Sequence, residues 1–209
     1  MFKAKRYSPI SFPLQPGETA FRDNWVVIRR YHVEGAGPML VDLSHRPKYD
    51  VQDPDLNRVL QTLDLEPPAS VGRCAWRRGF LVNRLNPGQA SVWHLGDGPA
   101  DALAAPMVTE VTDGLVLAAL IAESVFPILE KVTPLDLQDP LRRPPFAIQG
   151  PVLGVPCQIV VIKPEITLLA CSRGYGQSMA EALLEAGGEY GLAPAGERAF
   201  HRALGPVST

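Results

Sequence analysis

The chain has 209 residues, of which 46% are hydrophobic and 20% charged, and its formal net charge at pH 7 is −2. This composition is typical of a globular protein and excludes a disordered chain. The nearly balanced charge provides no general attraction to nucleic acid or to a membrane surface, so we expect neither as a partner. The 21 prolines and 18 glycines are scattered along the chain, which predicts many turns and short elements.

The sequence also indicates a cellular compartment. The chain has an odd number of cysteines, namely Cys74, Cys157 and Cys171, and no two of them have CxxC spacing. Both features argue against a disulfide framework and against a four-cysteine zinc site. The basic N-terminus is not followed by the apolar segment of a secretory signal. The longest aliphatic run, residues 115–122, is far shorter than the roughly 20 residues that cross a bilayer. We therefore predict a reduced, cytoplasmic protein.

The predicted elements follow in chain order. Residues 1–20 contain three prolines without clear periodicity, which predicts an N-terminal arm on the surface or against a partner. Strands are predicted from β-branched and aromatic segments at residues 25–33, 39–43, 48–51, 90–95, 108–111, 115–121, 146–152, 156–162 and 166–172. Apolar residues at helical spacing predict a helix that begins near Pro54, with Asp53 as its N-cap. Further helices are predicted at residues 124–132, 174–190 and 195–204. Residues 72–95 read as one hairpin that turns at Asn86–Gly88.

Helices in this order follow runs of strands instead of alternating with single strands. That pattern predicts an α+β fold with mainly antiparallel sheets and packed helices. After the arm, residues 21–209 are expected to form one module. Two intertwined subdomains, at about residues 21–105 and 106–209, are an alternative description of that module.

No pattern of residues identifies a catalytic or metal site. The four histidines are dispersed, without HxH or HExxH spacing, so we expect no metal. Ser44 and His45 are neighbours in a predicted strand end, where side chains point to opposite faces, so they do not form a dyad by adjacency. The GxG of Gly174–Gly176 precedes a helix, but Met179 replaces the third glycine, which favours a tight turn over an anion site. The catalytic residues stay unknown.

Three stretches in the same order resemble the aminomethyltransferase (T-protein) superfamily of folate-binding proteins. They are LVDLSHRPK at 40–48, VGRCAW with LVN and VWHLG between 71 and 96, and LLEAG with YGLAPAG between 183 and 196. The resemblance implies the T-protein-like fold and tetrahydrofolate as the ligand to consider. Carried over by motif position, the residues expected to bind this cofactor are Asp42, His45, Asn83, Gln89 and Glu165.

The sequence departs from this family at three points. Gly88 and Gln89 stand where the family's enzymes have an acidic pair, and an amide cannot act as a carboxylate base. Lys163–Ile166 stands in place of the segment whose glutamate holds the pterin edge, with Glu165 as the one substitute. No counterpart of the family's C-terminal barrel follows. In size and in the stretch SRGYGQSMAEAL (172–183) the chain resembles the small gamma subunit of heterotetrameric sarcosine oxidase, an accessory chain of the same superfamily.

Three functions are compatible with these features. The first is a T-protein-like module without aminomethyltransferase activity of its own, which binds a folate or related ligand or serves as an accessory subunit of an oxidase or one-carbon complex. The second is a small tetrahydrofolate-dependent aminomethyltransferase in which Asp42, Asp97 or Asp113 replaces the lost carboxylate. The third is a structural interaction protein with no ligand site. We favour the first, because the family's acidic residue and barrel have no counterpart here.

Overall fold

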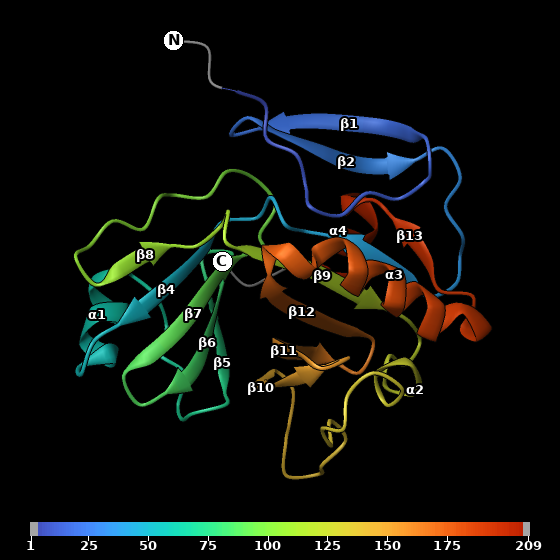
Figure 1. Ribbon diagram of the computed structural model, residues 1–209. Helices are drawn as coiled ribbons and strands as arrows, with labels where there is room; N and C mark the ends of the chain where they lie inside the picture. The colour runs from blue at the N-terminus through green and yellow to red at the C-terminus, as the bar shows by residue number, and fades with distance from the viewer. Residues whose placement is uncertain (1–3, 207–209) are drawn as a thin grey trace.

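Two sheets form the body of the molecule, and a separate hairpin lies across one end (Figure 1). The computed structural model describes residues 4–206. Its strands are β1 (Pro16–Arg22), β2 (Trp25–Tyr31), β3 (Met39–Asp42), β4 (Lys48–Gln52), β5 (Cys74–Arg77), β6 (Phe80–Asn86), β7 (Gln89–His94), β8 (Val108–Glu110), β9 (Leu115–Ile121), β10 (Phe146–Val152), β11 (Val155–Lys163), β12 (Ile166–Ser172) and β13 (Ala193–Ala195). Its α-helices are α1 (Leu56–Thr62), α2 (Phe126–Leu129), α3 (Gly176–Gly187) and α4 (Glu197–Leu204).

The six-stranded sheet has the order β10-β11-β12-β9-β3-β13, and the five-stranded sheet has the order β5-β6-β7-β4-β8. Within these two sheets β13 pairs with β3 in parallel, and the other pairings are antiparallel. Helices pack on these sheets and, over the described residues, no barrel follows them. The predicted α+β class with mainly antiparallel sheets is therefore confirmed.

Alternation along β9 shows how the layers are built. Val116, Ala118 and Leu120 belong to the core under α2 and α3, whereas Leu117, Ala119 and Ile121 belong to the core between the two sheets. Successive side chains of a strand point to opposite faces, so a continuous apolar run lines two cores at once. A third core, around Val92, lies between the five-stranded sheet and α1.

The hairpin β1–β2 packs on the start of α4, where a glycine permits close contact. A Cβ atom on Gly196 would lie 2.4 Å from the backbone of Arg29 in β2. Glu34, just after β2, accepts hydrogen bonds from Tyr31 N (2.9 Å) and Gly196 N (2.8 Å). The hairpin and α4 therefore form one packed unit.

Several predicted boundaries were wrong. The N-cap of α1 is Asp55, whose side chain accepts from Arg58 N, and Asp53 instead accepts from Asp55 N. Residues 74–94 form a three-stranded meander, because Arg78 and Gly79 adopt positive φ angles and turn the chain between β5 and β6. The predicted helix at 124–132 reduces to the four residues of α2.

Two strands were not predicted, namely β1 and β13. β1 begins at Pro16, so the last part of the predicted arm is paired with β2. The sheets also exchange strands across residue 105: β3 belongs to the six-stranded sheet, and β8 to the five-stranded sheet. The division into subdomains at that position stays a prediction. In the part of the chain that is described, no helix has the length and apolarity to span a membrane.

Candidate functional site

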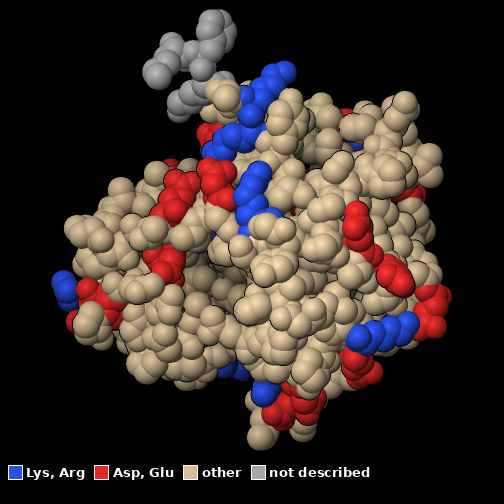
Figure 2. Space-filling view, viewed as in Figure 1, with Lys and Arg blue, Asp and Glu red and all other residues tan. Residues whose placement is uncertain are grey.

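A cavity of about 430 Å³ opens between the two sheets, at the end where the apolar core between them stops. We call it the inter-sheet pocket. It is bounded by β4 and β7 on one side and by β10, β11 and β12 on the other. Figure 2 shows the hollow in this face, between the five-stranded sheet on the left and the six-stranded sheet on the right. A cavity of this size and partly polar lining is typical of small-ligand sites.

One wall of the inter-sheet pocket is a polar stripe on the five-stranded sheet. Asp50 pairs with Ser91, and Gln52 pairs with Gln89, so all four side chains share one face of β4 and β7. Gln89 Nε2 donates to Asp50 Oδ1 at 2.7 Å, and Gln52 Nε2 donates to Asp50 Oδ2. The carboxylate of Asp50 is thereby fixed in position at the pocket without a basic partner among the described residues.

The opposite wall is formed by amides of the six-stranded sheet. Gln149 and Gln158 are cross-strand partners on β10 and β11. Gln158 Nε2 donates to Ser91 Oγ at 2.6 Å, which links the two sheets across the pocket. Asn83 Nδ2 donates to the same oxygen at 3.2 Å, and the buried Asn83 Oδ1 has no hydrogen-bond partner among the described residues. Amides and a carboxylate beside apolar walls suit a flat heterocycle with N–H and C=O groups.

The residues predicted to bind the cofactor do not meet at one place. Gln89 lines the inter-sheet pocket, and Asn83 lies directly behind Ser91 at its wall. Asp42 and His45 line a different cavity, beneath the β1–β2 hairpin. Glu165 is exposed in the turn between β11 and β12, at the opposite end of these strands from Gln158. Their shared role as one folate site stays a prediction.

Asp50 is the pocket residue that the sequence reasoning missed. Its position could have been found from the alternation of Lys48-Tyr-Asp-Val-Gln52, which places Asp50 and Gln52 on one face of a strand. The three carboxylates considered as replacements for the family's acid lie elsewhere. Asp97 is exposed, Asp113 pairs with Arg6 at the surface, and Asp42 lies in the other cavity.

A buried charge cluster lies between the hairpin and α4. Glu197, with 1% of its side chain exposed, accepts from His45 Nε2 (2.8 Å), Arg46 NH2 (2.5 Å) and Arg22 NH1 (2.6 Å) on one oxygen, Oε1. Burial by itself would raise the pKa of Glu197, but the imidazoles of His201 and His45 and the guanidinium of Arg46 hold it well below its usual range. The cluster fixes the loop after β3 to the hairpin and to α4.

Lys48 is a second buried charge-bearing group near this loop. Its Nζ donates to the carbonyl oxygens of Ser44 (2.7 Å) and Arg46 (2.9 Å). Burial lowers its pKa to about 7. Lys48 therefore stabilises the turn after β3 through hydrogen bonds to the backbone, and it does not line the inter-sheet pocket. Within residues 4–206, no group of three or more His, Cys, Asp or Glu side chains is arranged to hold a metal ion.

Comparisons with known proteins identify the fold. No family model and no curated protein sequence matches the chain. Among solved structures, the chain is similar to one chain of the heterotetrameric sarcosine oxidase from Corynebacterium sp. U-96, which was determined in complex with pyrrole 2-carboxylate. This match has a TM-score of 0.63 and 16% sequence identity, and it covers 77% of this chain and 89% of the oxidase chain. The glycine cleavage system aminomethyltransferase T from Bartonella henselae matches with a TM-score of 0.62 and 16% identity, over 90% of this chain and 58% of that one.

The two matches agree on the architecture. The chain spans nearly the whole length of the matched oxidase chain and somewhat more than half of the aminomethyltransferase. At 16% identity such likeness concerns the fold. The chain therefore has a T-protein-like fold in a short form, close in length to the matched oxidase chain.

Proposed function

We propose that this chain binds a folate, or a ligand with the same flat amide-bearing heterocycle, in the inter-sheet pocket. The observation that carries the proposal is the polar lining formed by Gln89, Asp50 and Gln158 at the position where two T-protein-like sheets part. The pterin ring has N–H donors for a carboxylate and a carbonyl acceptor for an amide. Asn83, with an unsatisfied Oδ1 behind Ser91, supports this wall.

We further propose that the chain acts as an accessory subunit in one-carbon or amine metabolism. Its likeness in length to one chain of a heterotetrameric oxidase supports a role beside partner chains. At position 89 an amide stands in place of the carboxylate that the aminomethyltransferases of this fold are expected to use. An amide can orient a ligand but cannot supply negative charge to a developing cation.

A titration with tetrahydrofolate and with 5-formyltetrahydrofolate, a stable analogue, tests the binding proposal. A ligand at about 100 times its dissociation constant stabilises the folded state by about 2.7 kcal/mol, which is a rise in Tm of roughly 5 to 10 °C for a chain of this length. We expect a saturable rise that falls sharply in Gln89→Ala. Gln61→Ala, which removes an exposed amide from α1, is the matched control and should keep the full shift. No saturable shift with either folate would overturn the proposal.

One observation favours a second candidate, a small tetrahydrofolate-dependent aminomethyltransferase. Asp50 places a carboxylate in the inter-sheet pocket, 2.7 Å from the amide nitrogen of Gln89. It could therefore supply the charge that position 89 lacks. An assay of methylene transfer from an aminomethyl donor to tetrahydrofolate separates the two candidates. Product formation that Asp50→Asn abolishes would favour the enzyme, whereas folate binding without turnover favours the accessory role.

A further inference from the structure

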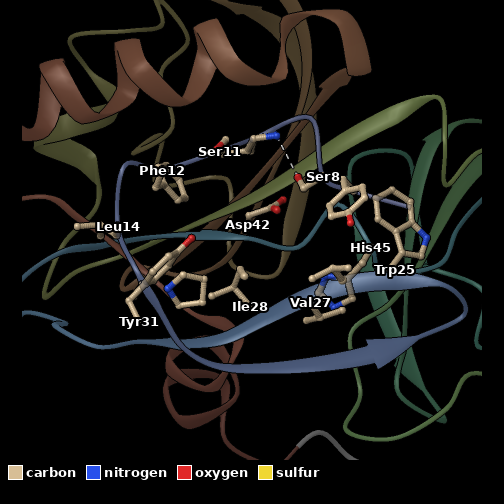
Figure 3. Close-up of a pocket in the computed structure, with 15 residues that line it drawn as sticks. Ser8, Ser11, Phe12, Leu14, Trp25, Val27, Ile28, Tyr31, Asp42 and His45 are labelled. Carbon is tan, nitrogen blue, oxygen red and sulfur yellow. Dashed lines mark hydrogen bonds between the residues drawn. The ribbon is translucent and has the colours of Figure 1, made fainter. Parts of the chain in front are cut away.

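A second cavity lies beneath the β1–β2 hairpin, separate from the inter-sheet pocket, and the two have no lining residue in common. We call it the hairpin pocket. Its volume is about 390 Å³, and it is enclosed by the N-terminal segment, by β2 and by the end of β3 (Figure 3). The N-terminal segment is held in place by α3: Ser11 N donates to Gln177 Oε1 (2.8 Å), and Gln177 Nε2 donates to Ser11 O (3.1 Å). The cavity is therefore bounded by anchored backbone.

The wall of the hairpin pocket carries one formally charged side chain at neutral pH, Asp42. Asp42 Oδ1 accepts from Ser44 N (2.9 Å) and Ser44 Oγ (2.6 Å). No basic side chain within the described residues forms an ion pair with Asp42, and nearby Lys48 Nζ donates to backbone carbonyls instead. Asp42 Oδ2 accepts no hydrogen bond from the described residues, so this partly buried carboxylate has an oxygen left to accept from a ligand in a cavity of mixed polar and apolar lining.

His45 also lines this cavity, and its ring has one nitrogen that can accept a hydrogen bond. Its Nε2 donates to Glu197 Oε1 at 2.8 Å, so in the neutral ring Nδ1 carries the lone pair. Burial lowers the pKa of His45, which favours that neutral form. Figure 3 shows Asp42 and the hydroxyl end of Tyr31 directed into the enclosed space. Asp42 and His45 are acceptors and therefore match a ligand that is positively charged and donates hydrogen bonds, whereas the hydroxyl groups of the lining can donate or accept.

Apart from Ser8 and Ser11, the rest of the lining is aromatic and aliphatic. Phe12 and Tyr31 form an edge-to-face pair with centroids 6.2 Å apart, and Trp25 lies toward the other end of the pocket. The faces of such rings attract cations. The ring of Trp25 is already occupied in this way, because the guanidinium of Arg6 lies 4.6 Å and that of Arg173 5.5 Å from its centroid. Phe12 and Tyr31 are therefore the ring pair left to contact a ligand.

We propose that the hairpin pocket is a binding site for an organic ammonium ion, whose charged nitrogen pairs with Asp42 and whose apolar substituent packs against Phe12 and Tyr31. The ammonium N–H groups donate to the carboxylate of Asp42 and to Nδ1 of His45. The proposal does not depend on folate binding, because it concerns different residues in a different cavity.

Isothermal titration with benzylammonium chloride and with benzyl alcohol, a neutral probe of nearly the same shape, tests the charge requirement. We expect benzylammonium to bind saturably and at least about tenfold more tightly than the alcohol, which corresponds to about 1.4 kcal/mol. Asp42→Asn should remove this preference while leaving the weak affinity for the alcohol unchanged. Glu185→Gln, which removes an exposed carboxylate from α3, should leave both affinities as in the unmodified chain.

Equal affinity for the two probes, or no saturable binding of benzylammonium at tens of millimolar, would overturn the proposal. So would unchanged selectivity in Asp42→Asn. The comparison of the two probes needs only the unmodified chain, so the test stands even if the Asp42 variant does not fold. A folate titration on the same sample distinguishes the two sites, because loss of one interaction leaves the other measurable.

Discussion

Glu197 holds together three segments that are distant in the sequence. Its single oxygen Oε1 accepts from Arg22 in the hairpin and from His45 and Arg46 in the loop after β3. Arg46 has 2% of its side chain exposed and also donates to Gly96 O at 2.7 Å. A buried carboxylate with several donors stabilises a fold mainly because removing it leaves the donors unpaired.

Replacement of Glu197 by glutamine should therefore lower the free energy of unfolding by about 3 to 5 kcal/mol at pH 7, because it leaves a buried guanidinium uncompensated. The folded-state pKa of Glu197 is depressed below the ordinary 4.5, so its contribution is present above that pH and is lost as the pH falls through the folded-state value. Urea unfolding of both proteins between pH 3 and 8 measures the effect.

In that experiment the stability difference should be constant above about pH 5 and should shrink in more acidic solution. Glu185→Gln serves as the control, since an exposed carboxylate on α3 should change stability by less than about 0.5 kcal/mol. A difference below 1 kcal/mol at pH 7 would show that Glu197 is not the centre of this cluster.

The hairpin β1–β2 is the element whose position shapes the hairpin pocket, and it rests on α4. Its backbone at Arg29 approaches Gly196 so closely that no side chain fits between them. Glu34 reinforces the contact by accepting from Tyr31 N and Gly196 N. An added methyl group at this contact must displace backbone, which cannot rotate away as a flexible side chain can.

We therefore expect Gly196→Ala to destabilise the protein by at least about 2 kcal/mol and to increase hydrogen exchange in β1 and β2. Gly188→Ala is the matched control, because it has φ of −58° and nothing within 4 Å of its Cβ position. That substitution should be neutral or slightly stabilising. Normal exchange of the hairpin in Gly196→Ala would mean that α4 does not determine where the hairpin packs.

At the scale of the whole molecule, the two sheets share one core, although no strand of one sheet is paired along its length with a strand of the other in the described chain. Val41 and Trp93, from the first half of the sequence, pack with Leu117 and Val160 from the second half. Strand β3 joins the six-stranded sheet, and β8 returns to the five-stranded sheet. Such interleaving couples the two halves of the sequence, because the shared core is complete only when strands from both halves are in place.

Unfolding should consequently be a single transition, with the same midpoint by far-UV circular dichroism and by tryptophan fluorescence. Leu117→Ala, at a fully buried position between the sheets, should lower the stability seen by both probes together by about 2 to 5 kcal/mol. Val33→Ala is the exposed control and should have little effect. Two separated transitions would instead support independent subdomains at residues 21–105 and 106–209.

Much of the fold could be read from local patterns. Alternation and β-branched runs predicted strands such as β9 and β12, and helical spacing predicted α3, because these elements carry their own burial pattern. β1 and β13 were missed, since both are edge strands with proline and without an apolar alternation. The turn at Arg78-Gly79 was missed because the apolar runs on both sides of it read as one strand.

For the candidate sites too, some features could be predicted from the sequence and others depend on the tertiary structure. The sequence by itself determined the fold class, the resemblance to the T-protein superfamily and the absence of an acid at position 89, because each depends on residue identity in a local stretch. Only the tertiary structure decided that Asp50 lies beside Gln89, that Asp42 and His45 line another cavity, and that Glu197 joins His45 across the molecule. Cross-strand register and the packing of the hairpin on α4 set these contacts, and both are made between residues far apart in the chain.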